Sequence, residues 1–231
     1  MQRIENIMSW DELTIILLAG ILFLAAIDIF TVILGTVIIA KHKKRAVWFG
    51  AGMILTGLYS LSCFLPRYAM ALFTFPVEIY TVISEVSYIF AFGSIFTFFL
   101  YARQNYGSGK ILLFIIFFIA SYIPSWIMFS LFKGGIISAA DPFARIISLL
   151  NSLGLIASLI YTAIIYCRNK EKEKTAHKLW ILFLIFEILF ALNFIFNPEF
   201  GLWSHISCGL LCGTGFYMLS ALKKEKKAVE Q

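Results

Sequence analysis

The sequence contains little charge, few histidines and few cysteines. Only 14% of its 231 residues are Asp, Glu, Lys or Arg, whereas 61% are hydrophobic. A water-facing surface of ordinary polarity cannot be built from this composition, so we expect lipid to be the solvent. The cysteines show no paired extracellular spacing, which argues against a disulfide framework; they are Cys63, Cys167, Cys208 and Cys212.

Missing motifs exclude several kinds of chemistry. No Gly-x-Ser-x-Gly turn, Walker loop or His-Glu-x-x-His pattern occurs. Lysine is absent from the interior of the long apolar runs, which excludes a retinal Schiff base. His42 and His177 fall at one edge of these runs and His205 near the other, so no three-histidine metal site can assemble. We therefore expect no metal and no cofactor, and enzymatic activity is the less favoured interpretation.

Long apolar runs dominate what is present. A helix needs about 20 apolar residues to cross the roughly 30 Å hydrocarbon layer of a bilayer. Seven runs of this kind follow one another, at about 13–40, 47–66, 72–102, 111–132, 142–167, 179–197 and 200–222. The connections between them are too short to hold a folded domain. The sequence thus predicts one all-α domain over residues 1–231, a bundle of seven transmembrane helices.

The basic residues predict the orientation of this bundle. Of the 19 Lys and Arg residues, all but four fall in alternate connections and in the C-terminal tail; the four are Arg3, Arg67, Lys133 and Arg145. Short loops rich in Lys and Arg stay cytoplasmic, so we expect the N-terminus outside and the C-terminus inside. We read the basic residues as topology signals that also touch anionic membrane lipids, not as a nucleic-acid surface.

The start of the chain is expected to remain in the protein. It lacks a strongly basic n-region, and the first apolar run is longer than the core of a signal peptide. The expected location is an integral position in a membrane, the inner (cytoplasmic) membrane of a bacterium.

Ionisable residues inside the runs carry most of the functional information, because a charged group in hydrocarbon costs roughly 2.5 to 3.5 kcal/mol on insertion scales. Asp28 lies near the middle of the first run, Glu85 in the third and Glu187 near the middle of the sixth. Further polar residues lie toward the outer side. The pattern predicts an outward-opening polar pocket that binds a ligand through Asp28, Glu85, Arg145, Asn151, Glu187, Asn193 and His205.

Each of these residues also has a structural explanation. Asp28 could stay protonated and hydrogen-bond a neighbouring Ser or Thr, and Arg145 could form an ion pair with Glu78 or Glu85. Cys208 and Cys212 are four residues apart and share a helix face, where a soft metal could bind, although helix packing is the expected role. Interior glycines such as Gly50 and Gly52 predict close helix packing.

The third run and the turn after it resemble part of a known module. The segments are Glu85–Tyr88, Phe96–Tyr101 and Ala102–Gly107, and they resemble the third helix of the seven-helix sensor module at the N-terminus of many bacterial histidine kinases. Trp48 in the second run and Pro124 in the fourth follow a similar order. In that family the seventh helix leads into a kinase or related output domain, whereas this sequence ends at Gln231. The resemblance implies a membrane sensor whose output depends on a separate cytoplasmic partner.

The sequence therefore favours a sensor or receptor-like membrane module that binds a small or lipophilic ligand. Two alternatives stay open. In the first, Asp28, Glu85 and Glu187 serve a small transporter coupled to protons or cations. In the second, a pair of carboxylates acts as acid and base in an intramembrane enzyme that modifies lipids.

Overall fold

The computed structural model describes residues 10–72, 77–106, 110–133, 135–136, 142–167, 185, 208–216 and 218–220. Their regular structure is helical throughout, which confirms the all-α class for this part of the chain. The elements are α1 (Trp10–Leu72), α2 (Val77–Tyr106), α3 (Ile111–Lys133), α4 (Pro142–Cys167) and a helical segment at 208–220, which we call the terminal segment.

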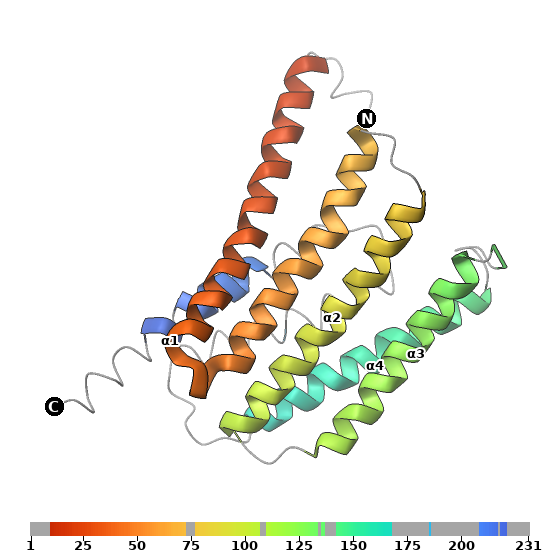
Figure 1. The fold of residues 1–231 in the computed structure, drawn as a ribbon. Helices are drawn as coiled ribbons and strands as arrows, with labels where there is room; N and C mark the ends of the chain where they lie inside the picture. The colour runs from red at the N-terminus through yellow and green to blue at the C-terminus, as the bar shows by residue number, and fades with distance from the viewer. Residues whose placement is uncertain are drawn as a thin grey trace.

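Helix α1 is a hairpin. A straight helix of 63 residues would be roughly 95 Å long. Figure 1 instead shows two arms that run side by side in opposite directions, joined near residues 41–46. We call residues 10–41 the first arm and residues 46–72 the second arm. The reversal falls at the basic connection expected between the first two apolar runs.

Glycines let the two arms approach closely. A methyl group on Gly35 would lie 2.6 Å from the carbonyl oxygen of Gly50, and one on Gly57 would lie 2.8 Å from that of Asp28. In a straight helix, residues 15 positions apart are about 22 Å apart, so the contact between Gly35 and Gly50 requires the reversal. At Gly35 and at Gly57, any side chain would push the backbones of the two arms apart.

The helix bounds agree with the expected apolar runs at most points. Helices α3 and α4 coincide with the runs 111–132 and 142–167 to within one residue. The expected connection at 67–71 is wrong, because α1 continues to Leu72; the residues 68–72 (Tyr-Ala-Met-Ala-Leu) are compatible with continued helix. Helix α2 also extends four residues further, to Tyr106. The run 179–197 lies outside the described residues except for Ile185.

Helix α2 lies between the α1 hairpin and the α3–α4 pair (Figure 1). The main core joins both arms of α1 to α2, α4 and the terminal segment; its buried side chains include Ile38, Phe49, Met53, Phe98, Leu159 and Leu211. A second core joins α2, α3 and α4 through Phe99, Phe114 and Ile165. The Phe99 and Phe114 rings stack with centroids 4.0 Å apart. The terminal segment is therefore part of the packed bundle.

The described helices are apolar on the outside. One of them, Leu18–Lys41, is long and apolar enough to cross a membrane, and only 28% of its apolar 18-residue stretch is buried. Shorter apolar helices within the described residues are Ala46–Ser62, Ile156–Ile165 and Cys208–Ser220. Large apolar side chains point away from the bundle, such as Phe23 at 67% exposure and Leu112 at 69%.

We predict that Gly50→Ala destabilises the protein by about 1 to 3 kcal/mol, because the added methyl would lie 2.7 Å from the backbone oxygen of Gly35, which cannot turn aside. Gly213→Ala is the matched control, since its added methyl meets no atom of another described segment within 4 Å. That control should leave stability unchanged or raise it by up to about 1 kcal/mol. Unfolding of the purified protein in lipid micelles measures both. Equal stability of the two variants would contradict the tight hairpin.

Candidate functional site

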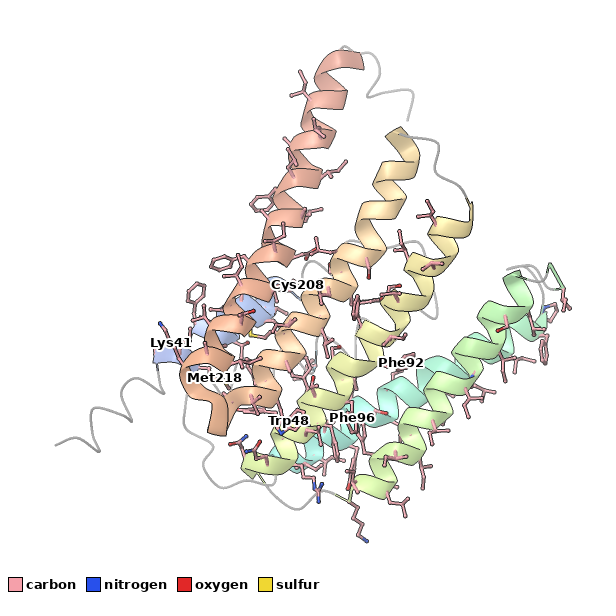
Figure 2. The ribbon with its side chains drawn as sticks, viewed as in Figure 1. Lys41, Trp48, Phe92, Phe96, Cys208 and Met218 are labelled. Carbon is pink, nitrogen blue, oxygen red and sulfur yellow. The ribbon has the colours of Figure 1, made fainter. Side chains whose placement is uncertain are left out.

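A buried polar cluster lies where the two arms of α1 meet the terminal segment. Asp28 and Thr31 come from the first arm, Ser60 from the second and Cys208 from the terminal segment, and all four are fully buried. Figure 2 shows Cys208 lying against α1. These side chains, together with Cys212, are called the Asp28 cluster below. It joins three helical segments that are far apart in the sequence.

The backbone of the hairpin places Asp28 in this cluster. Gly57 packs against the carbonyl oxygen of Asp28 and against Val32, so the two arms touch at this level. Ser60 lies on the second arm nearly one turn beyond Gly57 and is oriented into the same interior. A larger residue than glycine at position 57 would separate Asp28 from Ser60.

Thr31 links the first arm to the terminal segment. Its Oγ1 donates a hydrogen bond to the carbonyl oxygen of Ile27 at 2.8 Å and lies 3.4 Å from the carbonyl oxygen of Cys208. The Sγ atom of Cys212 is 3.0 Å from the same Oγ1. A hydroxyl has one proton, and the short bond to Ile27 uses it. We infer that the Cys212 thiol is the donor in this third contact.

Cys208 links the terminal segment to both arms. Its thiol interacts with the side chains of Asp28, Ser60 and Thr31. Its Sγ atom also lies 3.9 Å from the carbonyl oxygen of Thr56. Thiols are weak donors, so these polar contacts add modestly to the apolar packing of Leu211 and Met218 that holds the terminal segment in the main core.

Other buried hydroxyls are satisfied within their own helices. Thr97 of α2 bonds to the carbonyl oxygen of Ser94 at 2.8 Å, and Thr162 of α4 bonds to that of Ser158 at 2.9 Å. This is the usual way in which Ser and Thr are accommodated in apolar surroundings. We assign these residues a structural role, and they do not extend the Asp28 cluster.

The structure describes the seven predicted site residues to different extents. Asp28 is buried in the interior, in keeping with its predicted position. Glu85 lies on α2, and Arg145 and Asn151 lie on α4, but their side chains are outside the described part. Glu187, Asn193 and His205 lie outside the described residues altogether. A shared pocket formed by all seven remains a prediction.

Sequence reasoning missed the partners of Asp28. It offered a neighbouring Ser or Thr as a partner of Asp28 without identifying Thr31 or Ser60, and it assigned Cys208 and Cys212 to helix packing. The available signal was spacing, because Asp28 and Thr31 share one face of a helix, as do the two cysteines. Both cysteines are free thiols. Among the residues that the structure describes, no group of three His, Cys, Asp or Glu side chains is placed to hold a metal ion.

Comparison with protein-family models, with curated proteins and with solved structures gives no match for this chain. The resemblance to histidine kinase sensor modules is therefore untested by these comparisons.

We predict that Thr31→Val lowers the free energy of unfolding by about 1 kcal/mol, because it removes the hydroxyl that contacts the terminal segment. Thr36→Val is the matched control: Thr36 also donates to its own helix, to the carbonyl oxygen of Val32 at 2.9 Å, but it is exposed. The control should change stability by less than about 0.5 kcal/mol. A double-mutant cycle with Cys212→Ala measures the coupling directly. Additive effects of Thr31→Val and Cys212→Ala would contradict the contact.

Proposed function

We propose that the chain is an integral membrane protein that works as a sensor or receptor-like module. In this proposal all seven apolar runs cross the bilayer, with the N-terminus outside and the C-terminus in the cytoplasm. A small or lipophilic ligand binds toward the outer side, and a separate cytoplasmic partner receives the signal. The Asp28 cluster connects the two events.

The distribution of side chains supports the membrane location. Apolar residues cover the outside, as at Phe23 and Leu112, whereas the fully buried interior holds Asp28, Thr31 and Ser60. In water, an apolar surface of this extent would drive aggregation. In lipid it carries no such cost, and the polar groups inside can hold the helices together. A bilayer is the environment in which both features are favourable.

The contact of Thr31 with the terminal segment is the single observation that carries the signalling role: its Oγ1 lies 3.0 Å from the Sγ atom of Cys212 and 3.4 Å from the carbonyl oxygen of Cys208. It ties the first arm to the terminal segment, which leads in the sequence into the basic tail at 223–227. A ligand that favours one packing of the terminal segment on the hairpin would thereby alter the position of the tail. A ligand acts in this way only if it binds the two packings with different affinity.

The membrane location is tested by fractionating cells that express the full chain. We expect the protein to remain in the membrane pellet after extraction with alkaline carbonate and to be released only by detergent. Release into the carbonate supernatant would contradict the membrane location. A known peripheral protein and a known integral protein in the same sample calibrate the extraction.

The signalling role is tested by fusing the whole chain through Gln231 to a histidine kinase output domain and measuring autophosphorylation in membranes. We predict that Asp28→Asn and Thr31→Val each change the output several-fold, because both alter the contact with the terminal segment. Thr36→Val should leave it unchanged. Identical output from all four proteins would contradict the proposal. The transporter alternative would gain support from a proton or cation flux in liposomes that Glu187→Gln abolishes.

A further inference from the structure

Three basic side chains are gathered at one end of the bundle. Lys41 lies at the reversal of α1, Arg103 in the last turn of α2 and Lys110 at the start of α3, and all three are exposed. Figure 1 shows that the reversal of α1, the end of α2 and the start of α3 lie at the same end. The segments 41–46 and 103–110 contain no Asp or Glu. We call this set of three residues the basic end.

Contacts with α4 hold Lys110 in place. The hydroxyl of Tyr161 accepts a hydrogen bond of 2.7 Å from the backbone N–H of Lys110. The ring of Tyr161 in turn packs against Phe99 and Phe117, with centroids 6.2 Å away in each case. The start of α3 is thereby fixed relative to α2 and α4. The charge of Lys110 is presented from a defined backbone position.

The basic end borders directly on apolar surface. Ile111, Leu112 and Leu113 follow Lys110 and are exposed. Trp48, which is 39% exposed, lies at the same end as Lys41 (Figure 2). Tryptophan is enriched at the boundary between the hydrocarbon and the head groups of a bilayer. In the proposed membrane location, this tryptophan would place the three charges at the depth that lipid phosphates occupy.

We propose that the basic end binds the phosphates of anionic phospholipids. This inference depends on the proposed membrane location but not on the signalling role. A guanidinium matches a phosphate with two parallel hydrogen bonds, and an ammonium adds a compact charge. A lipid is favoured over an acidic protein because the charges border on the apolar belt and do not lie on a projecting domain.

The test uses the full chain reconstituted in phosphatidylcholine bilayers with a trace of spin-labelled lipid. We expect labelled phosphatidylglycerol to associate more strongly than labelled phosphatidylcholine, with a preference of about fivefold if a single charge dominates. The preference should decrease in high salt, because salt screens exposed charges. The triple variant Lys41→Gln, Arg103→Gln, Lys110→Gln should lower it, although the other basic residues expected on this side remain.

The matched control removes three charges at the opposite predicted side, through Arg67→Gln, Lys133→Gln and Arg145→Gln. It should keep the preference for the anionic lipid. A preference that is absent in the wild type, or equal in the two triple variants, would overturn the proposal. Failure of the protein to insert into bilayers would instead contradict the membrane location. The amount of inserted protein is measured for every variant, so that failed insertion is distinguished from a lost preference for the anionic lipid.

Discussion

The close approach of the two arms of α1 is the constraint on which the remaining structure depends. Gly35 and Gly50 let the backbones touch near the reversal, and Gly57 lets them touch at Asp28. In lipid, where no water is expelled, this kind of contact gains its stability from dispersion forces and hydrogen bonds at short range. The paired arms present one continuous surface, on which α2 packs and to which the terminal segment is bound.

The Asp28 cluster follows from that surface. A carboxyl inside an apolar bundle is expensive unless polar groups surround it, and here they come from three segments. Ser60 is supplied by the second arm, and Cys208 and Cys212 are supplied by the terminal segment. These polar contacts lie beside the apolar packing of Leu211 and Met218, and together they hold the terminal segment against the hairpin.

Much of the helical architecture could be predicted from the sequence, because apolar runs and basic connections follow from the bilayer thickness and from charge. Helices α3 and α4 and the reversal near residues 41–46 were predictable on these grounds. The continuation of α1 to Leu72 was not, because the apolar run 47–66 stops before Arg67 and so indicated a connection, while the residues after it are compatible with helix. A Ser or Thr neighbour of Asp28 was foreseen in kind, but its identity and the part played by the terminal segment were not. Which face of the terminal segment meets the hairpin depends on packing between residues that are 177 positions apart.

That separation along the chain has a consequence for biogenesis. The contacts of the α1 hairpin are local, so the hairpin can close soon after both arms have left the ribosome. Thr31 meets Cys208 only after the residues between them, a separation of 177 positions, have been synthesised. Until then, the face of the hairpin that carries Asp28 and Thr31 awaits its covering helix. Synthesis of the terminal segment completes this part of the interior.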